Sequence, residues 1–285
     1  MLNSDPKRQA IHILRGYAYQ IWQSLDEWLS LAENEMLVVE GAEDIDKLGP
    51  DYAETTEVKD IQSCNLTLNS KEVLNAIIHY WDHKQRNKKV FIKRHRLLTT
   101  AERTKEQSSP FGEWKGLDFW DHCKNKHSDP KPLKDFLLAK DELPAELKDF
   151  IRTADDETLR TKLILPIEWA TGNPKREYLE EIILDKIKTL GINFKILPAV
   201  SEKALPALLK YVFEKACSTA DRELTYIKLL EQFEGSVTVP VPISAMTEKI
   251  SALTAHFEGM MQFPSTGATP QLALIQQSIT PTLPE

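Results

Sequence analysis

Residues 40–62 read E-G-A-E-D-I-D-K-L-G-P-D-Y-A-E-T-T-E-V-K-D-I-Q, and an apolar run rich in valine, residues 37–39, leads into them. The first half of the stretch contains four acids: Glu40, Glu43, Asp44 and Asp46. The Gly-Pro-Asp sequence at 49–51 indicates a turn, and a second extended run follows at 55–59. The pattern therefore predicts a β-hairpin with acids on one arm and an acid–lysine pair on the other.

The second arm places an acid and a base on the same side of a strand. Side chains alternate along a strand, so Glu57 and Lys59 share one face and Val58 occupies the other. Hard cations such as Mg²⁺ or Mn²⁺ take oxygen ligands, and one or two carboxylates commonly hold them beside a substrate phosphate. Asp44 and Glu57 are the candidate metal ligands, with the Val58 carbonyl as a possible third. Lys59 is the candidate positioning cation for an attacking water or a charged phosphate.

An acid followed at a distance by E-x-K also fits a solvated strand face with cross-strand ion pairs. The flanking sequence favours a catalytic interpretation. An R-G-Y-A-Y-Q sequence at 15–20 is predicted to lie in a helix, and residues 69–72 open a second helix. Extended runs are expected at 90–92 and 97–100.

Together, the G-Y-x-Y-Q helix, the E-x-x-E-D-I-D strand and the E-V-K strand resemble the double-stranded-DNA endonuclease effector domain of bacterial anti-phage systems. That family includes the nuclease of CBASS systems and the Lamassu effector nuclease, and it belongs to the PD-(D/E)xK superfamily. The resemblance is clearest over about the first hundred residues and thinner to about Gly235. Many relatives have glutamine where this chain has Glu57.

The resemblance implies an α/β fold with a restriction-endonuclease-like core, meaning a mixed central sheet flanked by helices, and a mainly helical C-terminal region. It implies an enzyme, a Mg²⁺- or Mn²⁺-dependent endonuclease acting on double-stranded DNA, with Gln20 near the active centre. Glu40 is a possible additional ligand, and Asp46 is the reserve candidate if the strand register differs by two. Such an enzyme needs gating, so we expect a homo-oligomer and a sensor or ATPase, either as a partner subunit or in a further C-terminal domain.

Composition and charge restrict which classes of protein the chain can belong to. The chain has 285 residues and a formal net charge of −7, so binding to DNA requires a local basic surface. Residues 83–101 contain no acid, and five of their basic residues are the DNA-binding candidates: Lys88, Lys89, Lys93, Arg94 and Arg96. The three cysteines fit a reducing cytoplasm, and the sequence has no apolar run long enough to span a membrane.

The chain is expected to divide into a nuclease core at 1–135, a mainly helical region at 136–235 and a connector helix with a Pro/Thr/Gln-rich tail at 236–285. The helical region either completes the domain or mediates oligomerisation. Gly191 is expected to end a helix that begins near 173. His79 and His83 share one helix face, but no third ligand stands nearby in the sequence, so they are interpreted as surface histidines.

Two other functions fit the same residues: a DNA-repair or structure-specific nuclease of the same fold, and a non-catalytic helical interaction subunit. A nuclease predicts that Asp44 and Glu57 converge with Lys59 beside them. An interaction subunit predicts that these side chains point apart into solvent.

Overall fold

A computed structural model of the chain describes residues 10–61, 65–107, 109–238 and 251. The chain divides into two compact units, Met1–Thr238 and Val239–Glu285, and the first of them contains the sheet and its helices. Asp5-Pro6 is a typical helix start, with Asp as N-cap and Pro at the first helical position, but it lies outside the described residues, as does almost all of the expected connector and tail.

The centre of the first unit is a six-stranded mixed sheet, which confirms the α/β class predicted from the sequence. The strands are β1 (Met36–Val39), β2 (Ile45–Leu48), β3 (Ala53–Lys59), β5 (Ile92–Thr99), β7 (Ile167–Ala170) and β8 (Glu223–Thr225). Their order is β7-β5-β3-β2-β1-β8. The first three form an antiparallel meander, β5 and β7 continue it in parallel, and β8 pairs antiparallel with β1. A small parallel pair, β4 (Asn65–Leu66) and β6 (Glu102–Arg103), forms a separate sheet.

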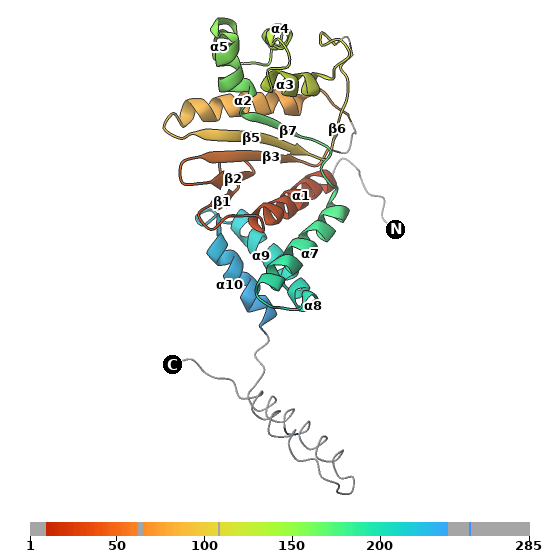
Figure 1. The fold of residues 1–285 in the computed structure, drawn as a ribbon, viewed down its shortest axis with the longest axis vertical. Coiled ribbons are helices and arrows are strands. Elements are labelled where there is room, and N and C mark those ends of the chain that lie inside the picture. The colour runs from red at the N-terminus through yellow and green to blue at the C-terminus, as the bar shows by residue number, and fades with distance from the viewer. Residues whose placement is uncertain (1–9, 62–64, 108, 239–250, 252–285) are drawn as a thin grey trace, which may run out of the picture. The chain divides into compact units, whose positions relative to one another are not determined.

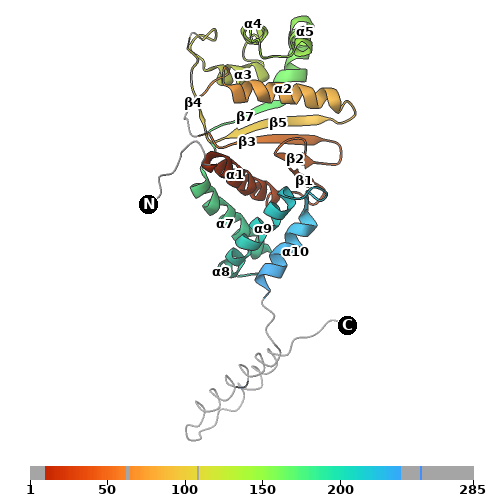
Figure 2. The ribbon, with the colours of Figure 1, turned by 180° about the vertical axis from the view of Figure 1, so that it is seen from behind.

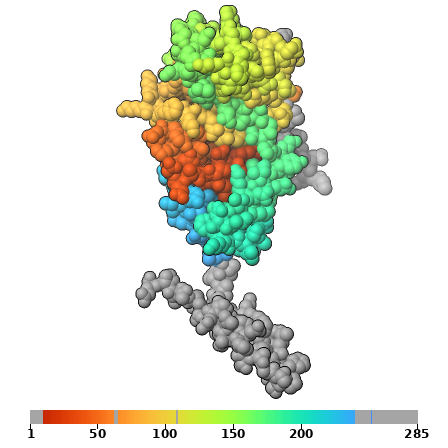
Figure 3. All heavy atoms as spheres, viewed as in Figure 1, coloured from red at the N-terminus to blue at the C-terminus, as the bar shows by residue number. Residues whose placement is uncertain are grey.

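Helices cover both faces of the sheet (Figures 1 and 2). One face carries α2 (Lys71–Arg86), α3 (Gly116–Lys124), α4 (Lys131–Leu138) and α5 (Ala145–Thr153), followed by α6 (Asp156–Leu159) and a π-helical turn, Arg160–Ile164. The other face carries α1 (Ile11–Trp28), α7 (Arg176–Asn193), α8 (Pro198–Ser201), the 3₁₀ turn Glu202–Ala204, α9 (Leu205–Ala216) and α10 (Tyr226–Val237). In the space-filling view, the yellow and green segments of α3 to α5 form one continuous mass beyond α2 (Figure 3).

Two hydrophobic cores follow from this layering, because neighbouring side chains of a strand point to opposite faces. Leu97 of β5 packs into the core beneath α2, whereas Leu98 packs into the core beneath α1. Val58 of β3 belongs to the α1 core. Glu57, its neighbour in the strand, therefore points to the α2 side.

The region after residue 135 belongs to the same unit as the hairpin. Residues 136–235 supply both edge strands of the sheet, β7 and β8, in addition to six helices. The alternating apolar residues at 162–169 predict a late strand, and the structure is extended only over its last part: β7 covers Ile167–Ala170, whereas Arg160–Ile164 form a π-helical turn. β7 lies at a sheet edge, as Pro166 predicts. The chain folds over 131–138 and 145–153 into helices that pack in the α2 core.

Several local predictions were wrong. The extended runs expected at 90–92 and 97–100 are not two strands: one strand, β5, covers Ile92–Thr99, and residues 90 and 91 precede it. The helical spacing of apolar residues from Ile11 predicts that Leu14 belongs to the core, but Leu14 is 66% exposed. Close packing against a strand would explain a glycine inside this helix, but a Cβ at Gly16 would meet nothing within 4 Å.

Gly191 does not end α7 but lies inside it, where the helix passes close to Ser201. A Cβ at Gly191 would stand 1.8 Å from the Ser201 Oγ and 2.8 Å from its Cβ. Ser201 is fully buried, so it has little room to move. The glycine is required by close helix packing rather than by a left-handed backbone.

Gly191→Ala should lower the free energy of unfolding by about 1–3 kcal/mol, because overpacking forces a shift of α7 against α8. The matched control is Gly235→Ala in α10, where a Cβ would meet nothing within 4 Å. The control should be neutral or stabilising by up to about 1 kcal/mol through helix propensity. Urea unfolding of both variants measures the difference, and equal stabilities would contradict the packing argument.

Candidate metal centre

The turn between β1 and β2 carries the acids of the hairpin. Both carboxylate oxygens of Asp46 accept backbone hydrogen bonds within this turn, from Ala42 N–H at 2.6 Å and from Glu43 N–H at 3.2 Å. A Cβ at Gly41 would lie 2.2 Å from the Asp46 Oδ2, so the turn closes only around glycine. Asp46 is buried and holds the turn in shape. Its oxygens are therefore used by the backbone, which argues against the reserve role as a metal ligand.

Asp44 joins this turn to the strand that carries Glu57 and Lys59. Its Oδ2 accepts a hydrogen bond of 2.6 Å from the Val58 backbone N–H. Burial raises the pKa of Asp44 to about 6, and the neighbouring Glu57 and Glu40 carboxylates add to the rise. The hydrogen bond from Val58 and the charge of Lys59 oppose it. Asp44 thus carries its charge at a cost that a nearby cation would reduce.

Glu57 and Lys59 form an ion pair at the end of β3. The Lys59 Nζ lies 3.1 Å from the Glu57 Oε1, and Glu57 is only 4% exposed. Burial acts to lower the pKa of Lys59, but the charges of Glu57 and Asp44 outweigh it and hold the pKa above its ordinary value. Lys59 is therefore an ammonium cation at neutral pH.

A cleft of about 480 Å³ opens between α1 and the end of β3. Asp44, Val58 and Lys59 line it from the hairpin, and Gln20 lines it from α1. The Gln20 Nε2 donates a 2.5 Å hydrogen bond to the Glu40 Oε1. Glu40 itself has a positive φ of 52°, a conformation fixed where β1 ends. The structure thus brings Gln20, Glu40, Asp44 and Lys59 to one place, as the sequence predicts, although their chemical roles stay predictions.

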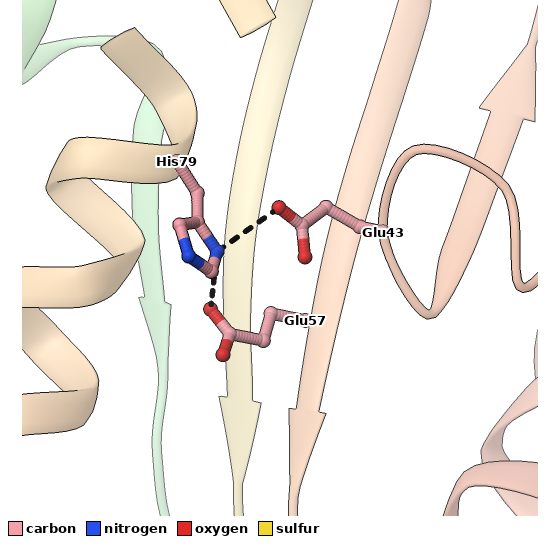
Figure 4. A group of neighbouring side chains, drawn as sticks. All are labelled: Glu43, Glu57 and His79. Carbon is pink, nitrogen blue, oxygen red and sulfur yellow. Dashed lines mark ion pairs between the residues drawn. The ribbon is translucent and has the colours of Figure 1, made fainter. Parts of the chain in front are cut away.

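A second group of side chains lies against Glu57 from the α2 side (Figure 4). Glu43, Glu57 and His79 each offer one ligand atom within 4.8 Å of the others. The His79 Nδ1 is 3.2 Å from the Glu43 Oε1 and 3.6 Å from the Glu57 Oε2. Sequence reasoning missed this group, because Glu43 reaches His79 only through the packing of α2 on the sheet.

The structure corrects the interpretation of His83 as a surface residue, whereas the His79 side chain is 43% exposed. The side chain of His83 is 12% exposed, and its Nε2 lies 2.7 Å from the Glu43 Oε1. This hydrogen bond raises the pKa of His83. Burial acts to raise the pKa of Glu43, but the bond to His83 and the surrounding imidazoles lower it below its ordinary value. The spacing of four residues between His79 and His83 was the signal in the sequence that the two histidines act together. Their acidic partner, Glu43, comes from the hairpin, and the sequence alone did not place it beside the helix.

The start of the basic block lies far from this site, whereas Arg96 pairs with Thr56, the neighbour of Glu57. β3 and β5 are parallel, and Ile92 at the start of β5 pairs with Ala53 at the start of β3, whereas Lys59 pairs with Thr99. Six residues of strand separate the two ends, about 20 Å. Lys88 and Lys89 therefore do not flank the metal site, because a parallel crossover returns the chain to the opposite end of the strand.

Three of the five basic candidates are also engaged by acids of the chain. Arg94 contacts Glu54 at 2.5 Å and Glu168 at 3.1 Å, while Lys93 contacts Glu54 at 3.0 Å. Arg96 contacts Glu27 of α1 at 2.6 Å. Lys88 and Lys89 are exposed and make no ion pair with any described residue. Of the five candidates, these two lysines are therefore the ones most available to contact DNA.

The donors near Asp44 fit a Mg²⁺ or Mn²⁺ ion. In the cleft they are the carboxylate oxygens of Asp44, with Val58 beside them, and hard divalent cations prefer such oxygen ligands. Glu57 is not among the residues that line the cleft, and it is connected to this side through the ion pair between its Oε1 and Lys59. Burial raises the pKa of Asp44, so a cation in the cleft would reduce the cost of its charge. The buried Glu57 Oε2, which has no hydrogen-bond partner among the described residues, faces His79 on the α2 side instead.

No protein-family model matches the chain, and no curated protein matches it. Similar solved structures include a Cap4 SAVED/CARF-domain containing receptor of Moraxella osloensis, with a TM-score of 0.44 and 13% identity over 70% of this chain and 43% of that chain. Another is the Cap4 SAVED/CARF-domain containing receptor of Acinetobacter baumannii with the cyclic trinucleotide 2'3'3'-cAAA, with a TM-score of 0.47 and 15% identity over 83% of this chain and 46% of that chain. The chain spans less than half the length of either receptor. Similarity at this level assigns neither a family nor a function to the chain.

No helix in the described ranges is long and apolar enough to cross a membrane.

Asp44→Asn should raise the melting temperature at pH 8 and leave it nearly unchanged at pH 4. The pKa of Asp44 is higher in the folded chain than its ordinary value of 3.8, so the folded chain binds more protons between pH 4 and 6. Stability therefore falls as pH rises through this window, and the neutral amide escapes that loss while it still accepts from Val58. We expect a rise of roughly 2–6 °C, measured by calorimetry in EDTA.

The matched control is Asp141→Asn, because the Asp141 side chain is fully exposed. It should melt with wild type at both pH values. A lower melting temperature of Asp44→Asn at pH 8 would show that the charge of Asp44 stabilises the fold instead.

Proposed function

We propose that the chain is a metal-dependent endonuclease that cleaves double-stranded DNA, with a restriction-endonuclease-like core of the PD-(D/E)xK type. One observation carries the proposal: Asp44 and Lys59 line the same cleft, and Glu57 is paired with Lys59 at 3.1 Å. The three residues belong to a turn and a strand that one hydrogen bond, from Val58 to Asp44, holds together. Charged groups that converge in this way are unlike a strand face with side chains splayed into solvent.

The mixed sheet supports the proposed fold. Its meander presents Asp44 just before β2 and Glu57 on β3, and helices α1 and α2 lie on opposite faces of that strand. The ligand pair therefore lies at the end of a rigid element rather than on a long loop. Rigid placement matters for phosphodiester cleavage, because a small displacement of a catalytic group is costly in rate.

Each of the three residues has a distinct task. Asp44 and Glu57 hold Mg²⁺ or Mn²⁺ with their carboxylate oxygens, and Glu40 stays close to Asp44 through its bond with Gln20. Lys59 remains protonated, so it donates hydrogen bonds to the attacking water or to a phosphate oxygen and does not act as a general base. A metal held by these carboxylates would supply Lewis-acid chemistry, which polarises a phosphoryl group and lowers the pKa of a bound water.

The resemblance of the hairpin and the G-Y-x-Y-Q helix to anti-phage effector nucleases supports a role in bacterial defence. Such an enzyme must be silent until it is needed. We infer that oligomerisation, or a sensor or ATPase on a partner or a further domain, provides the control. A DNA-repair or structure-specific nuclease would share the chemistry and differ in substrate.

Lys59→Ala should abolish Mg²⁺-dependent cleavage of plasmid DNA, with a loss of at least about 100-fold in rate, because the positioning cation is removed. EDTA should abolish wild-type cleavage as well. The assay follows conversion of supercoiled plasmid, with and without the products of neighbouring genes as activators. Lys210→Ala is the control, since Lys210 is an exposed residue of α9 paired only with Glu214 of its own helix among the described residues.

Cleavage that survives Lys59→Ala would place the active site elsewhere or reveal a contaminant. A folded wild type that stays silent with Mg²⁺ and Mn²⁺ under every combination of partners would favour the non-catalytic interaction subunit.

The double variant Lys88→Ala/Lys89→Ala should weaken DNA binding and lower the slope of log K against log salt by about 2, because two phosphate contacts are lost. Fluorescence anisotropy with a labelled duplex at several salt concentrations measures the slope. Lys210→Ala again serves as control. An unchanged slope would remove these two lysines from the DNA surface without affecting the proposal for Lys59.

A further inference from the structure

The side of Glu57 that faces α2 carries a separate set of metal-binding groups. Glu43 comes from the β1–β2 turn, Glu57 from β3 and His79 from α2, and their ligand atoms point toward one another (Figure 4). Two parts of the hairpin stretch and one helix thus meet at one point. We propose that Glu43, Glu57 and His79 form a second cation site, which takes a divalent transition metal such as Mn²⁺ or Zn²⁺.

The distances within the group match those between ligands of a single ion. The His79 Nδ1 lies 3.2 Å from a Glu43 oxygen and 3.6 Å from a Glu57 oxygen. Two donors that are each about 2.1 Å from one metal stand roughly 3.0–3.5 Å apart in octahedral or tetrahedral geometry. All three ligand atoms lie within 4.8 Å of one another, and the carboxylates of Glu43 and Glu57 would complete the approach to a bound ion.

Two atoms of the group are buried and have no hydrogen-bond partner. They are the Glu57 Oε2 and the His79 Nδ1, and this holds within the described part of the chain. Glu57 as a whole is 4% exposed, so water cannot readily compensate its oxygen. Buried polar atoms without partners are rare because they cost free energy, and a bound cation is a common reason for them.

His83 acts as a positioning residue for Glu43. Its Nε2 lies 2.7 Å from the Glu43 Oε1, one helical turn beyond His79. A carboxylate ligand that is hydrogen-bonded by a second group keeps its orientation when the metal is absent. Because the two histidines are one helical turn apart, His79 can act as a metal ligand while His83 orients the ligand Glu43.

The donor set selects the kind of metal. Imidazole nitrogen suits Zn²⁺ and related transition metals, carboxylate oxygen suits Mn²⁺, and Mg²⁺ prefers oxygen ligands alone. The second site thus differs in metal preference from the cleft beside α1, where Asp44 and the other oxygen of Glu57 are the proposed ligands. Glu57 would bridge the two positions, with Oε1 toward Lys59 and Oε2 toward His79. The second site needs only cation binding, so it stands whether or not the chain cleaves DNA.

Electron paramagnetic resonance of Mn²⁺ added to the whole chain tests the inference, because bound Mn²⁺ loses its free-ion signal. Wild type should bind Mn²⁺ at this site with competition from Zn²⁺, and millimolar Mg²⁺ should not displace it. His79→Ala should weaken this binding at least about 10-fold, and His83→Ala should weaken it by about 10-fold or more. His127→Ala, an exposed histidine on another part of the molecule, should leave it unchanged.

Asp44→Asn separates the two sites, since Asp44 is not part of the second. Retained Mn²⁺ binding in Asp44→Asn together with its loss in His79→Ala supports the second site. The reverse result overturns it and leaves the nuclease proposal intact. Mn²⁺ binding that depends on His79 in a chain that never cuts DNA would uphold the site and refute the nuclease. The His79 side chain is 43% exposed, so the variant should fold, which its melting curve verifies.

Discussion

The burial of one carboxylate, Glu57, is the constraint around which this part of the molecule is organised. Glu57 lies on a central strand between two helical layers and is 4% exposed. An ionised group in that position is expensive unless opposite charge or hydrogen bonds surround it. Lys59 meets one of its oxygens, two residues along the same strand, and His79 of α2 faces the other. A buried carboxylate is more costly than an apolar residue of similar size, and here each of its oxygens faces a basic side chain of the chain.

The hairpin turn is the second part of this arrangement, and local hydrogen bonds build it. Asp46 holds the backbone of the turn, Gly41 leaves room for the Asp46 carboxylate, and Asp44 accepts from Val58 across to β3. Because these bonds fix the turn on the strand, Glu43 and Asp44 point to different sides of Glu57. Glu43 lies on the α2 side, and Asp44 lines the cleft beside α1. Neighbouring acids in the sequence therefore serve two different places.

Sequence reasoning succeeds where contacts are local and fails where packing decides. Residues 40–62 predicted the Gly-Pro-Asp turn and the shared position of Glu57 and Lys59, because both depend on strand alternation and turn chemistry. The pairing of His79 and His83 with Glu43 could not be predicted, since it depends on the rotation of α2 above the sheet. The start of the basic block was placed at the wrong end of β3, because proximity in sequence says little about proximity across a parallel crossover. The short strands β2 and β8 carry too few residues to show a period.

The two faces of Glu57 explain how one strand can present two chemically different sites. The Asp44 side offers oxygen donors and an ammonium group at a cleft, whereas the Glu43 side offers imidazole and is closed by α2. In the absence of a cation, Lys59 and the helix histidines supply the compensating charge and polarity, so the strand remains stable while the ligands stay in position. A cation that enters either side would replace part of that compensation rather than create a site from disordered groups. The cost of ordering the ligands is then met during folding, which leaves more of the binding free energy for the metal itself.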